Sequence, residues 1–357
     1  MQVNLDKLCV SQECPVRQAI SKIDANEAGI VLVVSGDNEL LGTITDGDVR
    51  RAILAAFDLS RPVKDILALK DGTQLANPIT ALADQDAGHY LGLMKKHRIL
   101  HLPLLTPHNK IAGLVTMDDF VSDNVSPVRA VVMAGGFGSR LMPLTKTTPK
   151  PMLPVGGRPL MEIIIEQLRA AGVMHVNVTT HYKPEKIKEH FGNGNNFGVK
   201  IDYVNEDRPL GTAGALGLVA TPKDTTLVMN GDILTSVDFR AMIAFHRENG
   251  ADLTIAVRRH EVKVPYGVIE NDGVRVKRIK EKPSWKMFVN AGIYLLEPSV
   301  YKLIPNGDSF DMTDLIEKLI ENGFRVASFP IREDWMDIGK SDEYEKAQKY
   351  MEEMSSN

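Results

Sequence analysis

The stretch with the clearest capacity for chemistry in this 357-residue chain is AVVMAGGFGSRLMPLTKTTPKPMLPV. Its apolar start predicts a short buried strand, and Gly135, Gly136 and Gly138 follow at once. Glycines let the backbone approach a ligand closely, and the N–H groups of such a turn form a nest for phosphate. Arg140 comes next, and Lys150 lies between two prolines that favour a stiff, extended stretch. Together these groups indicate a triphosphate site.

Two better-known glycine loops do not fit this stretch. A Walker-type loop needs G-x-x-x-x-G-K-[ST], which the sequence lacks. A dinucleotide fingerprint needs a third glycine where this chain has Leu141, which argues against an NAD(P) oxidoreductase. The remaining alternative is a glycine-rich turn without a ligand, and the nearby cations Arg140 and Lys150 argue against it.

The pattern GGxGxRLxPLT followed by PKPMLPV resembles the signature of sugar-1-phosphate nucleotidylyltransferases, and the likeness extends from Arg129 to about Met351. The resemblance implies a Rossmann-like nucleotidyltransferase fold whose glycine loop and arginine hold the triphosphate. It further implies that Lys150 serves both the triphosphate and the transition state. The residues implied for this part of the site are Ala134, Gly135, Gly136, Gly138, Arg140 and Lys150, the last two as catalytic residues.

The segment that begins at Asn205 carries the clue to the base. By the same resemblance, Glu206 contacts the base edge, and Gly211 and Thr212 bind the nucleotide. An ionised glutamate only accepts hydrogen bonds, and guanine offers two adjacent donors that a carboxylate can accept together. Uracil and thymine present one N–H flanked by acceptors. Glu206 therefore favours GTP, and the segment around it resembles that of the ELGTAG-type guanylyltransferases. CTP stays open, because cytosine also offers a donor.

A metal site is expected after the apolar run Leu227-Val228-Met229. A carboxylate at the carboxyl end of a strand, such as Asp232, can hold Mg²⁺ against phosphates. The alternative is a turn or helix cap. The resemblance implies that Asp232 is a catalytic metal ligand and that Asp337 is the second. These aspartates are 337 − 232 = 105 residues apart, so only the fold can bring them together.

The sugar side of the site rests on resemblance alone. Gly267 in the YGV segment, Glu281 and Lys282 in EKP, and Asn290 in NAG match the family's sugar-phosphate-binding positions. Lys282 is also expected to act in catalysis by positioning the attacking phosphate. Without the resemblance, the cations of this segment are typical of a solvated basic strand.

The first third of the chain contains a duplicated unit. Residues 29–54 and 100–121 each predict two strands joined by a turn and then Thr-x-x-Asp opening a helix. Thr45 and Asp48 recur as Thr116 and Asp119, both at an offset of 116 − 45 = 119 − 48 = 71. A threonine cap with an aspartate in the first helical turn is the plain alternative.

This repeat resembles a tandem pair of CBS (cystathionine-β-synthase-type) domains of the α+β class. In that family the threonine and aspartate hold a nucleotide, which implies an adenosine nucleotide at Thr45, Asp48, Thr116 and Asp119. Many such pairs bind nothing and only dimerise, so this alternative stays open. The predicted boundaries are 1–122 for the pair (about 1–60 and 61–122), 123–128 for a linker and 129–357 for the catalytic domain.

The catalytic region alternates strands with helices, which predicts an α/β fold with a mostly parallel sheet. Strands are expected at 131–133, 176–179, 199–204 and 227–229, and helices at 160–171, 183–191 and 341–354. A CBS pair ahead of a guanylyltransferase-like domain resembles enzymes of legionaminic-type pathways that make GDP-glucosamine. Glucosamine 1-phosphate is therefore the expected sugar, with mannose and heptose phosphates left open.

Composition limits the function classes. A net charge of −4 gives no basic footprint for nucleic acid, and no run of 18 apolar residues predicts a membrane span. Cys9 and Cys14 have neither disulfide-framework nor zinc-site spacing. These features favour a cytoplasmic protein. The family resemblance implies an enzyme, expected as a homo-oligomer, that makes a nucleotide sugar from an NTP and a sugar 1-phosphate. A non-catalytic nucleotide sensor is the alternative of another class.

Overall fold

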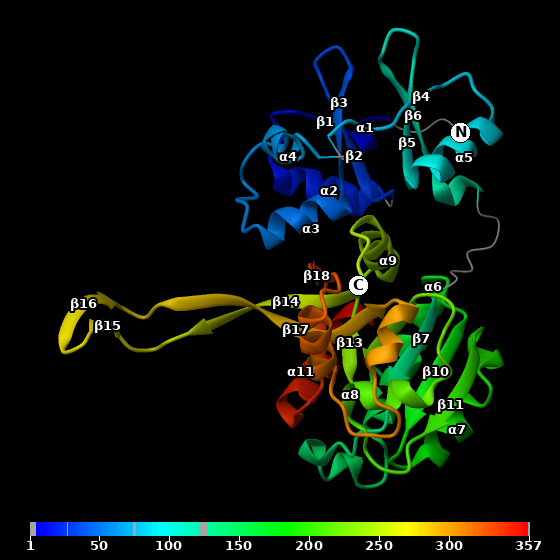
Figure 1. Ribbon diagram of the computed structural model, residues 1–357, viewed down its shortest axis with the longest axis vertical. Helices are drawn as coiled ribbons and strands as arrows, with labels where there is room; N and C mark the ends of the chain where they lie inside the picture. The colour runs from blue at the N-terminus through cyan, green and yellow to red at the C-terminus, as the bar shows by residue number, and fades with distance from the viewer. Residues whose placement is uncertain (1–4, 27, 74–75, 121–127, 356–357) are drawn as a thin grey trace. The chain divides into compact units, whose positions relative to one another are not determined.

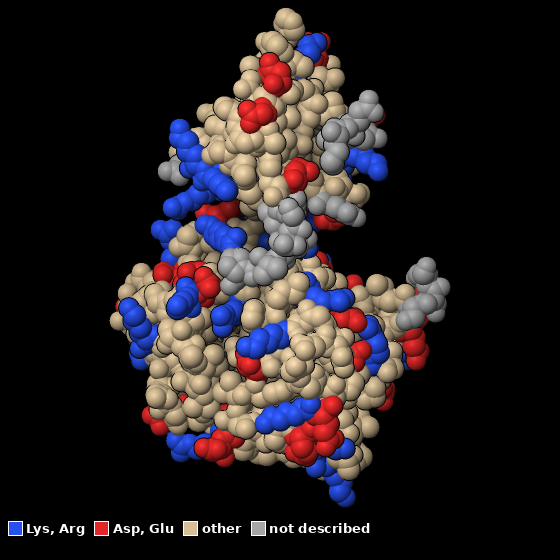
Figure 2. Space-filling model, turned by 90° about the vertical axis from the view of Figure 1, so that its right-hand side faces the viewer, with Lys and Arg blue, Asp and Glu red and all other residues tan. Residues whose placement is uncertain are grey.

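The computed structural model describes residues 5–26, 28–73, 76–120 and 128–355 (Figure 1). The chain forms two compact units, residues 1–124 and 125–357. The linker expected at 123–128 lies almost wholly outside the described residues. Within the described part, no helix combines the length and the apolar character that a membrane crossing requires. On the face in Figure 2, basic and acidic side chains are interspersed.

The first unit contains two three-stranded sheets of the same design. In each sheet the first two strands are parallel and the last two antiparallel. Both sheets also shift register at equivalent positions, Val33/Val34 and Leu104/Leu105, which keep the offset of 71 because 104 − 33 = 71. The elements are α1 Leu5–Leu8, β1 Cys9–Ser11, α2 Val16–Asn26, β2 Ile30–Val34, β3 Leu40–Thr45, α3 Asp46–Leu54, α4 Val63–Leu69, β4 Ala81–Leu82, α5 Ala87–His97, β5 His101–Leu105 and β6 Ile111–Thr116.

The two copies differ after the conserved pattern of strands. Thr45 opens the nine-residue helix α3, as the sequence predicts. Thr116 is followed by a short 3-10 turn, η1 (Met117–Phe120), and residues 121–127 lie outside the described part. The duplicated sheets confirm the α+β module.

The second unit is built on a seven-stranded sheet with the order β11-β10-β7-β12-β17-β14-β18. Four of its six neighbouring pairs are parallel, and only β17 runs against its neighbours. The strands are β7 Arg129–Met133, β10 His175–Thr180, β11 Lys200–Asn205, β12 Thr226–Asn230, β14 Leu253–Lys263, β17 Ser284–Leu296 and β18 Val326–Pro330. The predicted mostly parallel α/β sheet is confirmed.

Helices cover both faces of this sheet because its strands are apolar on both sides. On β7, Ala130 and Val132 face one core, and Val131 faces the other. The first core includes Ile164 of α6 (Leu160–Ala170), with α7 (Pro184–Phe191) and α9 (Phe239–Glu248) on the same face. The second core includes Leu315 of α10 (Met312–Glu321).

Short elements at the strand ends shape the site. They are η2 Ser139–Leu141, η3 Leu144–Lys146, η4 Lys150–Met152, β8 Pro154–Val155, β9 Arg158–Pro159, η5 Asn195–Phe197, α8 Gly211–Gly214, η6 Ala215–Leu218, β13 Ile233–Thr235, η7 Pro298–Leu303 and β19 Trp335–Asp337. The last helix, α11 (Ser341–Ser355), docks on β8, since Tyr344 and Gln348 both donate to the Pro154 carbonyl at 2.6 Å.

A two-stranded ribbon projects from the second unit (Figure 1). The outer halves of β14 and β17 pair beyond the sheet, and β15 (Val268–Asp272) with β16 (Arg275–Lys280) forms its tip. Several apolar side chains on this ribbon are exposed, among them Trp285 and Phe288.

Candidate active site

The candidate site lies at the carboxyl ends of β7, β10 and β12. The strands on both sides of β7 run parallel to it, so the connections leave in opposite directions and open a crevice there. A pocket of about 250 Å³ occupies this position. Among the residues expected from sequence, it is lined by Ala134, Gly135, Gly136, Lys150, Glu206, Gly211, Thr212 and Asp232.

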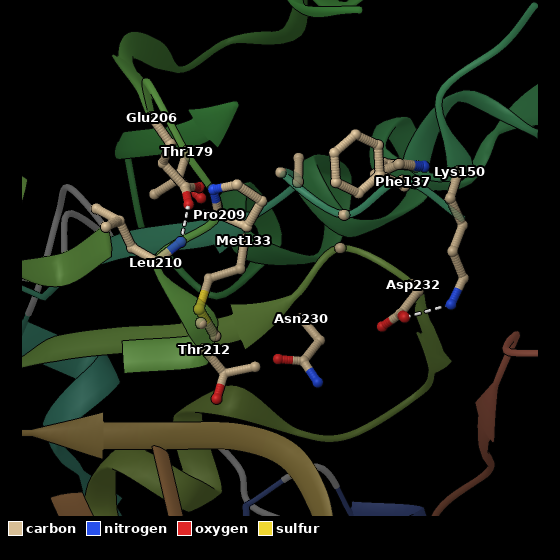
Figure 3. Close-up of a pocket in the computed structure, with 16 residues that line it drawn as sticks. Met133, Phe137, Lys150, Thr179, Glu206, Pro209, Leu210, Thr212, Asn230 and Asp232 are labelled. Carbon is tan, nitrogen blue, oxygen red and sulfur yellow. Dashed lines mark hydrogen bonds and ion pairs between the residues drawn. The ribbon is translucent and has the colours of Figure 1, made fainter. Parts of the chain in front are cut away.

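One end of the pocket carries an ion pair. Lys150, only 9% exposed, donates to Asp232 Oδ2 (Figure 3). Lys150 begins the 3-10 turn η4, so the fully extended conformation expected between its two prolines is wrong. The other carboxylate oxygen, Asp232 Oδ1, is buried and has no hydrogen-bond partner among the described residues.

Asp337 lies beside this pair because β13 and β19 are antiparallel neighbours. Their register pairs Ile233 with Asp337, and the Ile338 N–H donates to the Asp232 carbonyl at 3.0 Å. Burial, followed by the charge of Asp232, raises the pKa of the Asp337 carboxyl. The fold thus brings together two carboxylates that are far apart in sequence.

The donor set at this end fits Mg²⁺. This ion is usually bound by one or two carboxylates together with substrate phosphates. Within the described ranges, no cluster of three or more His, Cys, Asp or Glu residues could form a complete protein-built metal site. Asp232, whose Oδ1 has no partner in the described part of the chain, and Asp337 would provide two carboxylate ligands and leave the other coordination positions of the ion to a substrate.

The glycine loop is held tightly at two positions. A Cβ atom on Gly135 would lie 2.5 Å from Glu206 Oε1, so only glycine leaves that carboxylate in place. Gly138 has φ +64°, and a Cβ there would lie 2.8 Å from Thr145 Cγ2 and 3.2 Å from Lys150 Cβ. Gly138 does not line the pocket, but its lack of a side chain lets the loop pack against Lys150.

Arg140 is more distant from the pocket than the sequence suggests. It lies on η2, is exposed and is not a lining residue. Its guanidinium is close enough to oppose the rise in the pKa of Asp337. Arg140 therefore stands at the charged end of the site rather than inside the pocket.

Glu206 marks the opposite end of the pocket (Figure 3). It is 8% exposed, and its Oε2 accepts a hydrogen bond from the Leu210 N–H at 3.2 Å. Its own N–H donates to the Thr180 carbonyl at 2.8 Å, which fixes the residue at the end of β10. One carboxylate oxygen is therefore already engaged by the protein, and Oε1 is the oxygen beside Gly135.

Gly211 and Thr212 line the pocket but have structural partners. The Thr212 N–H and hydroxyl both donate to Asp311 Oδ1, at 3.0 and 3.3 Å. The Thr212 hydroxyl in turn accepts from the Met312 N–H at 2.8 Å. Gly211 has φ +77°, and a Cβ there would lie 2.6 Å from the same Asp311 oxygen. These residues join the pocket wall to the start of α10.

Half of the lining residues were not predicted from the sequence, and Asn230, Thr179 and Phe137 are among them. Asn230 ends β12, and its Nδ2 lies 2.6 Å from where a Cβ on Gly292 would be. Thr179 is the second-last residue of β10 and has a buried hydroxyl. The half-exposed Phe137 ring contacts the rings of His181 and Tyr182, with centroids 5.3 and 5.6 Å apart. Position at a strand end was the available signal for Asn230 and Thr179.

The expected sugar-side residues lie outside this pocket. Gly267, Glu281 and Lys282 lie on the projecting ribbon, where a Cβ on Gly267 would be 3.1 Å from Glu281 Oε2. Lys282 is exposed and has φ +42°. Asn290 is closer to the pocket, because its Oδ1 accepts from the Gly292 N–H at 2.9 Å and Gly292 adjoins Asn230.

The first Thr-x-x-Asp pair of the N-terminal unit is a complete capping box. Thr45 accepts from the Asp48 N–H at 3.3 Å, and Asp48 Oδ2 accepts from the Thr45 N–H at 2.9 Å. Lys70 and Arg51 also donate to Asp48, at 3.0 and 2.6 Å. Burial opposes ionisation, but Lys70 and then Arg51 outweigh it, and the pKa of Asp48 is lowered.

The second pair is different. Asp119 accepts from the Thr116 N–H at 2.7 Å and from its hydroxyl at 3.0 Å, but Asp119 is exposed. The structure of the first unit therefore offers one buried, neutralised aspartate and one that remains open to solvent.

Comparison with known proteins places this fold and site in a family. Residues 129–354 match the nucleotidyl transferase family, and residues 3–55 and 63–123 match the CBS domain. The chain belongs to the nucleotidyl transferase family, with a CBS pair ahead of the transferase domain.

Particular relatives share this likeness. A mannose-1-phosphate guanylyltransferase of Mycobacterium tuberculosis is 34% identical over 226 residues, 61% of this chain and 62% of that protein. A UTP–glucose-1-phosphate uridylyltransferase of Synechocystis sp. is 34% identical over 241 residues, 62% of each. The chain thus spans about 62% of the length of these relatives.

A solved structure gives the same result. The crystal structure of a Bacillus anthracis protein, provisionally assigned as a glucose-1-phosphate thymidylyltransferase, has a TM-score of 0.53 and 26% identity. The match covers 63% of this chain and 95% of that protein.

Proposed function

We propose that this protein transfers a nucleoside monophosphate from GTP to a hexose 1-phosphate, giving a GDP-sugar and pyrophosphate. One observation carries the proposal. A single pocket has the Lys150–Asp232 pair at one end, beside Asp337, and the buried Glu206 at the other. The first end has the charged groups that a triphosphate and its metal ion require. The second end has a carboxylate that can accept hydrogen bonds from a base.

The choice of GTP rests on Glu206. Of the relatives described above, one is named for guanylyl transfer and another for uridylyl transfer, so overall likeness does not decide the base. An ionised carboxylate accepts from the adjacent N–H groups of guanine and opposes the acceptors of uracil. CTP remains the second candidate, because cytosine also offers a donor.

In the proposed reaction, an oxygen of the sugar phosphate attacks the α-phosphorus of GTP in line with the departing pyrophosphate. The bond from the α-phosphorus to the bridging oxygen breaks, and the protein supplies no covalent nucleophile. Lys150 and Arg140 stabilise negative charge on the transferring and leaving groups. Lys282 positions the attacking phosphate, which requires the ribbon that carries it to reach the substrate.

Asp232 and Asp337 would hold Mg²⁺ in this reaction. The bound ion supplies neutralisation of the phosphate charge. Both aspartates lie at the charged end of the pocket, and the unpartnered Asp232 Oδ1 supports this assignment.

Glucosamine 1-phosphate is the first candidate sugar, supported by the order of a CBS pair followed by a guanylyltransferase-like domain. Mannose 1-phosphate is the main alternative, supported by the Mycobacterium tuberculosis relative, and a heptose 1-phosphate is a third. The CBS pair would bind an adenosine nucleotide and regulate the reaction.

The first test is pyrophosphate release with Mg²⁺, crossing five nucleoside triphosphates against glucosamine, mannose and glucose 1-phosphates. We expect release with GTP and one of the sugars. Release only with UTP or dTTP would keep the reaction and refute the Glu206 argument.

A non-catalytic nucleotide sensor is the competing hypothesis. It predicts nucleotide binding by calorimetry without turnover for any sugar, with or without AMP or ATP. Retention of Arg140, Lys150, Asp232, Lys282 and Asp337 favours the enzyme.

A further inference from the structure

Thr179 carries an unexplained polar group at the inner wall of the pocket. The residue is 1% exposed, yet it is one of the lining residues (Figure 3). Its hydroxyl has no hydrogen-bond partner among the described residues. Buried polar groups nearly always have a partner, so a buried hydroxyl that faces a pocket indicates a partner supplied by a ligand.

The alternation of side chains along β10 determines the face of the sheet on which the Thr179 side chain lies. Successive side chains of β10 point to opposite faces of the sheet, and Thr180 on the other face donates to Asn205 Oδ1 at 2.9 Å. The Thr179 carbonyl accepts from the Ala134 N–H at 3.0 Å, which ties the residue to the start of the glycine loop. Thr179 is therefore held rigidly, with its side chain on the pocket side.

The position of Thr179 identifies the part of the ligand that it faces. Glu206 is bound through its N–H to the neighbouring residue, Thr180, so Thr179 and Glu206 lie at the same end of the pocket. The Lys150–Asp232 pair is at the far end (Figure 3). A second unpartnered buried atom, Asp232 Oδ1, belongs to that far end, so one unexplained polar group lies at each end of the pocket.

The chemistry of the two groups is complementary. Glu206 can only accept hydrogen bonds when ionised, whereas a threonine hydroxyl can donate one. Guanine presents the carbonyl oxygen at its position 6 directly beside the N–H donors that suit a carboxylate. We propose that the Thr179 hydroxyl donates to this carbonyl oxygen of the bound base, while Glu206 accepts from the neighbouring N–H groups. This inference rests on the proposed nucleotide site.

The test is direct nucleotide binding by calorimetry on the full chain, which does not depend on finding the right sugar. Thr179→Val removes the hydroxyl and keeps the shape of the side chain. We expect GTP to bind about five- to tenfold more weakly to this variant, the scale of one neutral hydrogen bond. Thr179→Ser, which keeps the hydroxyl, should restore affinity to near the wild-type value.

A matched control separates this role from a general loss of packing. Thr226 on β12 is a buried threonine, 2% exposed, that does not line the pocket, and its hydroxyl also has no hydrogen-bond partner among the described residues. Thr226→Val should leave GTP affinity unchanged. Equal weakening by Thr226→Val and Thr179→Val would overturn the proposal.

A second ligand identifies the atom involved. The triphosphate of 2-aminopurine riboside lacks the carbonyl at position 6 and, with it, the N1–H from which Glu206 would accept a hydrogen bond. Its affinity should be lower overall, but Thr179→Val should cause no further loss. An equal loss with both ligands would place the hydroxyl on the ribose or the phosphates and refute the base contact. GTP affinity unchanged by Thr179→Val would refute it as well. If the wild-type chain binds no nucleoside triphosphate, the proposed function itself fails.

Discussion

The Lys150–Asp232 ion pair is the residue-scale feature on which turnover should depend most. We expect Lys150→Ala and Asp232→Ala each to lower kcat on the order of 10²-fold or more, the scale for losing a preorganised charge contact. Steady-state pyrophosphate release with GTP and the preferred sugar phosphate measures this effect.

An exposed pair of the same composition provides the control. Lys200 and Asp202 lie 3.4 Å apart, with more than half of each side chain exposed. Exposed pairs contribute little, so Lys200→Ala should leave kcat within about twofold of wild type. Turnover near normal in Lys150→Ala or Asp232→Ala would refute their assignment.

Gly135, which lies beside Glu206, provides a test of base recognition. In Gly135→Ala the new methyl would meet Glu206 Oε1 and displace the carboxylate. We expect KM for GTP to rise on the order of tenfold, as for loss of a charged hydrogen bond, and the preference for GTP to fall. The measurement is KM for each nucleoside triphosphate.

Gly136→Ala is the matched variant, since a Cβ at Gly136 has nothing within 4 Å. It should keep the wild-type order of preference among nucleotides, whatever its effect on phosphate binding. If Gly136→Ala lost the wild-type order of preference among nucleotides while Gly135→Ala kept it, Glu206 would not be the residue that selects the base.

At this scale, sequence could identify residue types at strand ends but not their partners. Asp232 was predicted from its place after an apolar run, whereas its neighbour Asp337 depends on the β13–β19 register. Thr212 was expected to bind the nucleotide, but its hydroxyl is used by Asp311 and Met312. Such hydrogen bonds join segments about 100 residues apart, and no local pattern encodes them.

Elements were predicted more fully than side-chain contacts. The expected strands and helices of the second unit agree with β7, β10, β11, β12, α6, α7 and α11 to within a few residues, because each has a clear hydrophobic period or a proline or glycine boundary. The projecting ribbon was not foreseen. Its alternating basic and apolar residues predict strands but not whether they pack on the body.

The contact of Lys70 with α3 tests how the first unit is held together. Lys70 is 9% exposed and donates to both the Thr43 carbonyl and Asp48 Oδ2. Lys70→Ala leaves a buried carboxylate without one of its cations, and we expect a loss of about 3 kcal/mol in unfolding free energy. Urea unfolding followed by circular dichroism measures it.

Lys64 provides the comparison, because its pair with Glu13 at 2.8 Å is largely exposed on both sides. Lys64→Ala should cost at most about 1 kcal/mol. Equal effects of Lys64→Ala and Lys70→Ala would show that Asp48 does not need its buried cation.

His246 joins α9 to the sheet and makes stability depend on pH. It is 2% exposed, and its ring contacts Thr254 Oγ1 at 2.7 Å and Glu297 Oε1 at 3.0 Å. Burial lowers the pKa of His246 despite the opposing effect of Glu297. Below about pH 6.5 the unfolded chain therefore binds a proton that the folded chain does not, and stability should fall as pH decreases.

Urea midpoints between pH 7.5 and 5.5 test this, with His246→Asn as the comparison. The midpoint of the wild-type chain should fall more over this range than that of the variant. Parallel curves would show that His246 does not govern the change.

For the whole molecule, the two CBS copies predict unequal responses to an adenosine nucleotide. Asp48 is already bound by Lys70 and Arg51, whereas Asp119 is exposed. We expect AMP or ATP to change the rate of pyrophosphate release about fivefold or more, within the usual range of allosteric coupling. Asp119→Ala should abolish this response and leave the basal rate unchanged.

Asp84→Ala, at another exposed acidic position of the same unit, should keep the response. A full response in Asp119→Ala would refute ligand binding at the second copy. Absence of any response in the wild-type chain would favour a pair that only dimerises.

The Lys150–Asp232 pair also has a kinetic consequence. Without substrate, Lys150 and Asp232 neutralise each other at the charged end of the pocket. A polyphosphate arriving alone must draw Lys150 away and leave Asp232 without its counter-charge. A polyphosphate that arrives together with its cation exchanges both at once. Rapid mixing should therefore show that the polyphosphate binds faster as a pre-formed complex with its cation than when it is added without the cation.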